Sequence, residues 1–177
     1  MRRLLRRATI PGVLILCLAG CFGSSESTGK LVCPTPLIAP DLDAAAQLRP
    51  GGSGGPDDVR FGVKLVSVNT NCSTEKIGLT ADTRISFLAA RTDPSVTHGD
   101  FAYFIAVADA QRNILNKKEY QMSVEFSPRQ GQVRMSDRVA VGLPLRDLSA
   151  GGKYLIIVGL QLSQEQLDFN RKQQQAQ

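Results

Sequence analysis

The chain has 177 residues, of which 42% are hydrophobic and 6% aromatic, and this length suffices for one domain with a sizeable core. Its formal net charge is +5, but four of its 21 basic residues are arginines within the first seven positions, and the remaining 17 nearly balance the 16 acidic ones. The composition therefore excludes a basic stripe for nucleic acid and an acidic interaction tail, and no nucleic-acid partner is expected.

The first 20 residues have the pattern of a removed export signal. Arg2, Arg3, Arg6 and Arg7 make its start positive, and residues 10–19 form an apolar run. This run is too short to cross a bilayer as a helix, which takes about 20 residues. A charged start, a short apolar core and small residues before a cleavage point are typical of a secretory signal.

This segment ends in Leu18-Ala19-Gly20-Cys21, which resembles a lipobox, the processing site of bacterial lipoprotein precursors. The resemblance implies that Cys21 becomes the first mature residue and carries a thioether-linked diacylglycerol, with a third acyl chain such as palmitate on its α-amine. Two acyl chains hold a protein stably at a membrane, where one does so marginally. An ordinary cleaved signal and an uncleaved anchor are the alternatives.

The residue after Cys21 is Phe22. In lipoproteins of Gram-negative bacteria, an aspartate at this place commonly signals retention at the inner membrane. Its absence implies an outer-membrane lipoprotein that faces the periplasm. The expected location is therefore the bacterial cell envelope, and the expected membrane contact is the lipid on Cys21.

Two cysteines, Cys33 and Cys72, remain once Cys17 leaves with the signal and Cys21 carries lipid. An even pair in an exported, oxidising compartment predicts a disulfide. A two-thiol metal site or a redox pair is the alternative, but a close Cys-x-x-Cys spacing and a set of histidines are both missing. We therefore expect a Cys33–Cys72 disulfide, no metal and no cofactor.

Residues 21–56 are expected to form a lipidated flexible tether and a Pro/Gly-rich lead-in. Residues 22–30 are rich in Gly, Ser and Thr and predict a random coil. Three prolines predict an extended segment over residues 31–40. Residues 41–48 are predicted to form one or two helical turns, and residues 50–56, Pro-Gly-Gly-Ser-Gly-Gly-Pro, predict a loop.

From residue 57 to residue 163, short runs alternate apolar and polar residues, the period-2 pattern of half-buried strands. Runs that are apolar on both faces favour central strands. The predicted strands cover residues 59–65, 84–89, 101–108, 120–126, 133–143 and 154–162, with a short one at 76–79. Turns or loops are predicted at residues 69–73, 92–99, 109–113, 127–132 and 148–153.

Six or seven strands at short spacing, joined by turns, predict an all-β fold with a single β-sandwich. An immunoglobulin-like arrangement is the leading expectation, although the chain has no tryptophan for the usual core position. A small barrel is the alternative.

A short helix is predicted within residues 164–177. Ser163 and Gln166 have the spacing of a capping box, in which the serine accepts a hydrogen bond from the N3 amide and the glutamine reaches back. Leu167 and Phe169 are its few apolar anchors. The glutamine-rich end is expected to fray.

The C-terminal half of the mature domain resembles uncharacterised proteobacterial lipoproteins. The resemblance rests on Tyr103-Phe104 in a central strand, a lysine-containing hairpin partner, and the ending Gly-Leu-Gln-Leu-Ser-x-x-Gln-Leu at residues 159–167. It implies no function.

His98 is the only histidine of the chain, in a polar loop close to Asp93 and Asp100. A hydrolase would need His98 to converge with a serine and a carboxylate. The alternative, which we favour, is a solvated loop residue. The sequence has no Gly-x-Ser-x-Gly elbow, because the match at residues 51–55 lacks the strand-to-helix setting that an elbow needs, and it has no His-Glu-x-x-His helix and no phosphate-binding loop. We therefore name no catalytic residue.

Two aspartate pairs, Asp41/Asp43 and Asp57/Asp58, stand close to the glycine-rich loop. Calcium binds such carboxylates. Aspartates beside glycines are more often a solvated turn, and we expect no metal site here.

Five aromatic residues of the predicted strands are expected to point towards the core: Tyr103, Phe104, Tyr120, Phe126 and Tyr154. Packing in the core is the favoured interpretation, because aromatic side chains on strands usually fill it. The alternative is the lining of an apolar pocket between the sheets.

These observations favour a membrane-anchored envelope lipoprotein that acts as a binding or interaction module and is not an enzyme. Its partner would be an envelope protein, bound through a strand edge or through loops. The alternative is a carrier that holds a small ligand in an apolar pocket between the sheets. A hydrolase that uses His98 is the second alternative.

Overall fold

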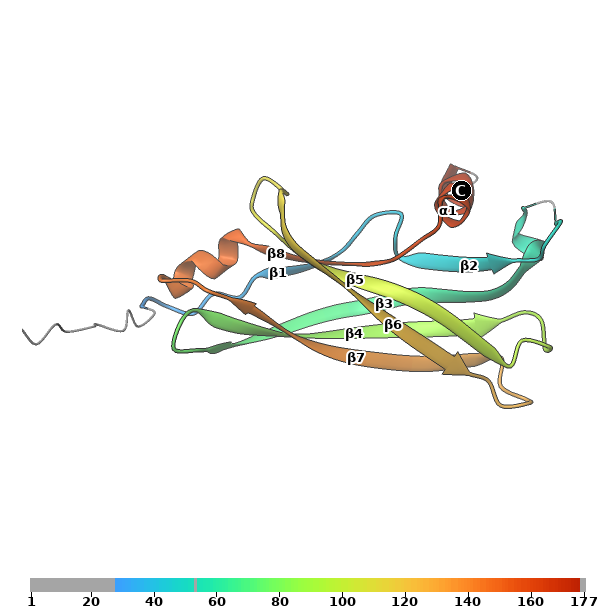
Figure 1. The fold of residues 1–177 in the computed structure, drawn as a ribbon, viewed down its shortest axis with the longest axis horizontal. Helices are drawn as coiled ribbons and strands as arrows, with labels where there is room; N and C mark the ends of the chain where they lie inside the picture. Colours follow the sequence, from blue (N-terminus) through green and yellow to red (C-terminus); the bar gives the residue numbers. More distant parts are fainter. Residues whose placement is uncertain (1–27, 53, 176–177) are drawn as a thin grey trace, which may run out of the picture.

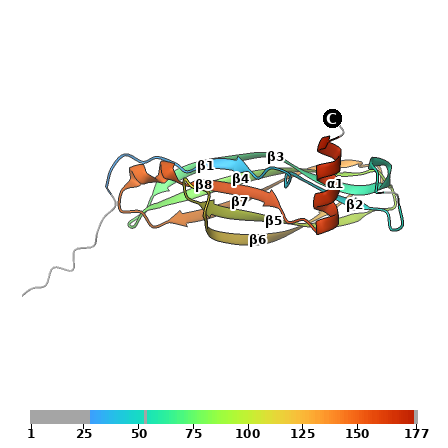
Figure 2. The same cartoon turned by 90° about the horizontal axis from the view of Figure 1, so that it is seen from above.

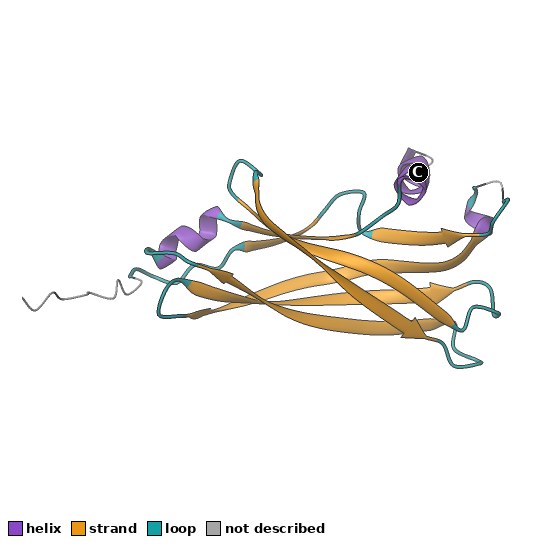
Figure 3. Ribbon diagram, in the orientation of Figure 1, coloured by secondary structure: helices purple, strands orange, loops and turns teal. Residues whose placement is uncertain are grey.

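The computed structural model describes residues 28–52 and 54–175, which form two packed β-sheets and one helix at the C-terminal end (Figure 1, Figure 3). The strands are β1 (Thr35–Ile38), β2 (Ala44–Leu48), β3 (Val59–Thr74), β4 (Leu79–Arg91), β5 (His98–Ala108), β6 (Ile114–Glu125), β7 (Gln132–Leu143) and β8 (Leu155–Leu160). The helix is α1 (Gln164–Gln175), and the 3-10 segments η1 (Pro56–Asp58) and η2 (Leu148–Lys153) precede β3 and β8. The predicted signal and Cys21 lie outside the described residues. Within those residues, no helix combines the length and the apolar character needed to cross a membrane.

Each sheet has four strands, in the orders β1-β8-β5-β6 and β2-β3-β4-β7. Neighbouring strands are antiparallel except β1 and β8, which are parallel. The two sheets stay separate, so the predicted all-β sandwich is confirmed and the small barrel is excluded. One large apolar cluster fills the space between the sheets, with Phe87, Tyr103, Ile156 and Leu160 among its most buried members.

Six of the strands follow the immunoglobulin-like order. β3, β4 and β7 occupy the places of strands A, B and E, and β8, β5 and β6 occupy those of F, C and C′. The place of strand G differs, because the chain turns into α1 after β8, and β1 pairs with β8 instead. The strand beside β8 therefore comes from the N-terminal part of the described chain, β1, and not from a strand that follows β8.

Strand β2 corrects the prediction of helical turns over residues 41–48. This segment pairs antiparallel with the start of β3. Its Ala-Ala-Ala run has high helix propensity. In so short a segment, pairing with β3 and contact with α1 decide the secondary structure. Strands β1 and β2 thus belong to the sandwich, although they come before residue 57.

Strand β3 corrects the predicted turn at residues 69–73. Over this polar stretch the odd-numbered residues are exposed and the even-numbered ones partly buried, so the period of two continues to Thr74. The chain turns at residues 75–78 instead. The short strand predicted over residues 76–79 is therefore wrong, and Leu79 begins the long strand β4.

The sandwich is elongated, and its two ends differ (Figure 1). At one end, the Thr28 N–H donates to the Arg146 carbonyl at 2.9 Å, beside η2. The opposite end holds the loop between β2 and β3, the loop between β4 and β5, and the turn between β6 and β7 (Figure 2). We call the first the tether-side end and the second the far end.

Cys33 and Cys72 lie in the geometry of a disulfide, as predicted, with their Cα atoms 5.7 Å apart. Cys33 comes just before β1 in one sheet, and Cys72 lies in β3 of the other. The crosslink therefore joins the two sheets across a sequence separation of 39 residues.

We predict that a Cys33→Ser/Cys72→Ser variant loses about 4 kcal/mol of unfolding free energy, because the crosslink lowers the conformational entropy of the unfolded chain. Urea unfolding of the variant and of the oxidised protein, followed by circular dichroism, measures the difference. The reduced wild-type protein is the control and should unfold with the variant. Equal midpoints for the oxidised protein and the variant would contradict the prediction.

Candidate binding groove

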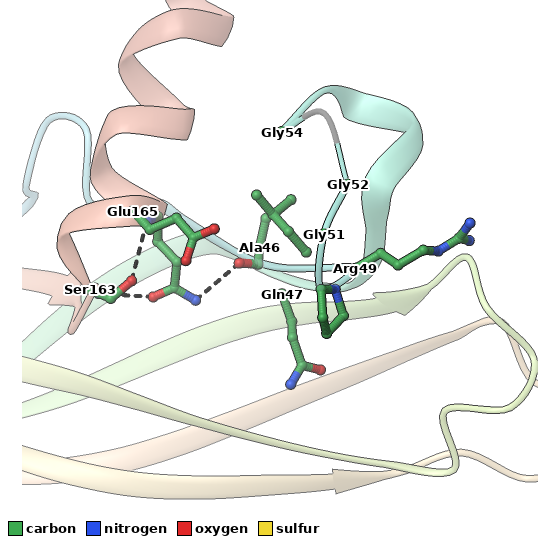
Figure 4. A pocket seen from close by; sticks show the side chains of 11 residues that line it. Ala46, Gln47, Arg49, Gly51, Gly52, Gly54, Ser163 and Glu165 are labelled. Carbon is green, nitrogen blue, oxygen red and sulfur yellow. Dashed lines mark hydrogen bonds between the residues drawn. The ribbon is translucent and has the colours of Figure 1, made fainter.

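A polar groove opens towards the far end, between the loop that follows β2 and the start of α1 (Figure 4). It has a volume of about 470 Å³ and is lined by residues 46–52, Gly54, Ser163, Glu165 and Gln166. A second hollow of about 420 Å³ continues it along the helix, since the two share Leu48, Gly54 and Glu165. We call the two together the loop–helix groove.

Glycines give the loop wall its shape. Gly51 and Gly54 have φ angles of 73° and 74°, in the left-handed region that other residues enter only at a cost. Asp58 holds the loop, because its Oδ2 accepts a hydrogen bond from the Gly54 N–H at 3.0 Å. Glycines carry no side chains to cover this wall, and part of its backbone is hydrogen-bonded within the loop, since the Gly52 N–H donates to the Arg49 carbonyl at 3.1 Å.

The helix wall begins with the predicted capping box, which the structure confirms. Ser163 Oγ accepts a hydrogen bond from the Gln166 N–H at 3.2 Å, and Gln166 Oε1 accepts one from the Ser163 N–H at 2.9 Å. These bonds satisfy amides that the first helical turn would otherwise leave without partners. The capping box thus fixes the first turn of α1, which forms the helix wall of the groove.

Two side-chain amides hold the helix on the edge of β2. Gln166 Nε2 donates to the Ala46 carbonyl at 3.0 Å (Figure 4), and Asn170, one turn further on, donates to the Ala44 carbonyl at 2.7 Å. Asn170 is buried and also donates to the Asp41 carbonyl at 3.0 Å. Alternate carbonyls of a strand leave the same side, here the side away from β3. The two amides therefore take the place of a neighbouring strand.

The groove carries charges of both signs. Arg49 lies on the loop wall and Glu165 on the helix wall, while Asp168 and Lys172 line the outer part. The Gln47 side chain points away from the loop and the helix (Figure 4). Such a lining suits a polar ligand that offers hydrogen bonds and carries little net charge.

His98 is the first residue of β5, and half of its side chain is exposed. Its Nε2 lies 2.9 Å from Asp100 Oδ1. The other candidate carboxylate, Asp93, instead accepts a hydrogen bond from Arg60 Nε at 2.9 Å. Among the described residues no serine hydroxyl is hydrogen-bonded to the His98 ring, so this geometry lends the hydrolase hypothesis no support.

The two aspartate pairs have local structural roles. Asp58 anchors the glycine-rich loop, and the backbone carbonyl of Asp41 accepts a hydrogen bond from α1. Across residues 28–52 and 54–175, no three His, Cys, Asp or Glu side chains are grouped so that they could hold a metal ion.

The five aromatic residues expected in the core occupy two places. Tyr103 and Phe126 are buried between the sheets, and Tyr120 and Tyr154 pack against the same cluster. Phe104 lies on the opposite face of its sheet, in a small separate cluster, so the expectation is wrong for this residue. Adjacent residues of a strand point to opposite faces, so the Tyr103 and Phe104 side chains lie on opposite sides of the sheet.

One carboxylate, Asp137 of β7, points into the sandwich. Its Oδ2 accepts a hydrogen bond from Tyr103 Oη at 2.5 Å. Burial, together with this carboxylate, raises the pKa of Tyr103 far above its usual range, so the phenol stays protonated. Tyr120 stacks on Tyr103 with ring centroids 5.1 Å apart. The Tyr103 hydroxyl and the Asp137 carboxylate thus satisfy each other's hydrogen bonding beside the apolar cluster.

An apolar groove lies on the outer face of a sheet and not between the sheets. It has a volume of about 350 Å³, and its lining includes Phe104, Ala106, Ile157 and Leu167. The hollow between β6 and β7 is smaller, at about 160 Å³, where ligand pockets begin at about 300 Å³. A carrier with this fold would therefore hold its ligand on the outside of the sheet.

Arg91 ties two loops together at the far end. Its guanidinium donates to the carbonyls of Pro94 and Val96 in one loop and of Ser127 and Pro128 in the next turn, at 2.7–3.2 Å. No sequence pattern marks this arginine, because its partners are backbone carbonyls that any residue supplies. The far end is therefore a set of connected loops.

Comparison with known proteins identifies no family. No protein-family model matches the chain, and no curated protein matches it in sequence. Its function is therefore argued from the geometry above.

We predict that Asn170→Ala loosens α1 from β2, because the change removes two hydrogen bonds and leaves the carbonyls they served without donors, a loss of about 1–3 kcal/mol. Hydrogen exchange of the α1 amides should rise about tenfold for each 1.4 kcal/mol lost. Gln174→Ala, at an exposed position of the same helix, is the control and should exchange like the wild-type protein. Unchanged exchange in Asn170→Ala would refute this role.

Hydrogen bonds from Ser95 and Arg60 hold the pKa of Asp93 at about 2, below the usual 3.8. A carboxyl group with a lowered pKa stabilises the folded state at pH values above its unfolded pKa, and this stabilisation is lost as the pH falls through the folded pKa. We predict that Asp93→Asn has a lower Tm than the wild-type protein at pH 7, and that the gap closes between about pH 4 and pH 2.

Thermal unfolding at a series of pH values measures this gap. Asp57→Asn, at an exposed aspartate of the same end, is the control and should keep the wild-type profile. A gap that stays constant down to pH 2 would show that the carboxylate charge of Asp93 is not the cause.

Proposed function

We propose that the chain is a lipid-anchored protein of the bacterial envelope whose β-sandwich serves as a binding module and has no catalytic activity. The lipobox-like Leu18-Ala19-Gly20-Cys21 supports the anchor. The loop–helix groove supports the binding role, because it is a hollow of about 470 Å³ whose lining includes polar and charged side chains.

The observation that carries the proposal is the separation between the tether and the groove. Thr28 lies at the tether-side end, whereas the groove flanks β2, which pairs with the start of β3 at the far end (Figure 1). Strand β3 runs over 16 residues, which is about 50 Å at 3.3 Å per residue. A lipid on Cys21 would turn the tether-side end to the membrane and leave the groove open to the periplasm.

The partner that fits this groove best is a polar segment of another envelope protein. The mixed charges of the lining disfavour a strongly acidic or basic ligand, and the volume of about 470 Å³ lies in the range of ligand pockets. Because α1 covers the edge of β2, such a segment binds between loop and helix rather than by adding a strand to β2.

Intact mass and site-specific photocrosslinking test this function. We expect the membrane-extracted protein to begin at Cys21 and to carry acyl chains. A photoreactive amino acid at Glu165, on the helix wall of the groove, should give a discrete adduct in intact cells. The same group at Arg134, on exposed strand β7, is the control and should give none.

The two parts of the proposal fail separately. A mass without lipid overturns the anchor and leaves an unanchored exported domain. Equal adducts from Glu165 and Arg134, or none from Glu165, overturn the groove as the binding surface while leaving the anchor in place.

A further inference from the structure

Three separate segments meet at the tether-side end. The backbone of Thr28 bonds to the Arg146 carbonyl at 2.9 Å and accepts from the Leu148 N–H at 2.7 Å. The turn between β3 and β4 packs beside the end of β7, since a Cβ on Gly78 would meet the Leu143 carbonyl oxygen. The entry of the chain, this turn and η2 thus form one surface (Figure 1).

An isoleucine stands exposed on this surface. Ile77 lies in the β3–β4 turn and is 69% exposed, more than any other large hydrophobic residue described. Turns of this kind usually carry polar residues or glycine. The turn is well held, because β3 and β4 pair up to Thr74 and Leu79 and the Glu75 N–H donates to the Gly78 carbonyl at 3.1 Å. Ile77 is therefore presented to solvent by a fixed part of the fold.

Four exposed cations belong to the segments that meet at this end. They are Lys30, Lys76, Arg146 and Lys153. The neighbouring acidic residues are Glu75 and Asp147, and Asp147 is engaged by Ser149, whose Oγ and N–H donate to it at 2.7 and 2.9 Å. The excess of positive charge here contrasts with the near balance of the mature chain.

We propose that the tether-side end is a membrane-docking surface, in which Ile77 enters the headgroup region and the four cations lie over anionic phospholipids. The inference rests on the proposed anchor, which supplies the proximity. Cys21 is seven residues from Thr28, so even a fully extended connection spans at most about 25 Å. Basic residues near an anionic surface and an apolar side chain at the interface reinforce a lipid anchor.

The absence of tryptophan from the chain makes a direct test simple. The lipidated Ile77→Trp variant, in vesicles of brominated phosphatidylethanolamine and unbrominated phosphatidylglycerol, carries a single fluorophore at this surface. We expect blue-shifted emission and a loss of about half its intensity, because interfacial side chains sit about 5–10 Å into the headgroup boundary. Arg129→Trp, on the exposed β6–β7 turn of the far end, is the matched control and should keep its intensity.

The charge contribution is tested in the same variant. Replacing Lys30, Lys76, Arg146 and Lys153 by glutamine should reduce the quenching to the level found in vesicles without anionic lipid. Quenching that is independent of these residues and of phosphatidylglycerol would overturn the electrostatic part of the proposal. Circular dichroism confirms that each variant is folded.

The intact mass separates failure of this inference from failure of the anchor. An acylated Ile77→Trp protein that is not quenched, or is quenched no more than Arg129→Trp, overturns the docking surface and leaves the anchor standing. If the mass shows no acylation, the anchor fails, and added vesicles then test the surface alone. Quenching on addition supports the surface, and its absence overturns it.

Discussion

The unpaired edges of the two sheets are the constraint on which the rest of the structure depends. An edge strand leaves alternate backbone amides and carbonyls without partners and invites another strand to pair. On one side of the sandwich the two ends of the chain lie along the edges: β1 pairs with β8 and is itself the outer strand of its sheet, and side-chain amides of α1 bind carbonyls of β2. A helix, rather than a strand, covers the edge of β2. The loop after β2 does not pack against this helix, and the loop–helix groove lies between the two.

The other side of the sandwich treats its edges differently. Strands β6 and β7 each have a single neighbour in their sheets. Lysines on β6, Lys117 and Lys118, and arginines on β7, Arg134 and Arg138, place charge along both edges, and Asp137 points inward from β7. Edge lysines and inward charges are the features by which β-proteins resist adding strands. The open side is therefore protected by charge against the addition of a further strand.

Sequence patterns predicted those elements of the fold that depend on interactions between residues close in the chain. The capping box at Ser163 needs only two residues at the right spacing, and the strands from β3 onward show in their alternation. Strand β2 could not be predicted, because its alanines take their state from β3 and from a helix that contacts it across 120 residues of sequence. The groove could not be predicted for the same reason. In the sequence, Gln166 and Asn170 have the pattern of an ordinary polar helix face, and only the structure shows that they donate to the Ala46 and Ala44 carbonyls.

The disulfide geometry also decides where a pull on the tether would act. Thr28 is five residues before Cys33, and Cys33 is paired with Cys72 in β3, a strand that pairs with both β2 and β4. Strand β1, by contrast, holds β8 through only four residue pairs, in a parallel ladder, the slightly weaker kind. A force arriving along the tether reaches the covalent crosslink before it reaches β1. The crosslink thereby protects the short strand β1 from such a pull.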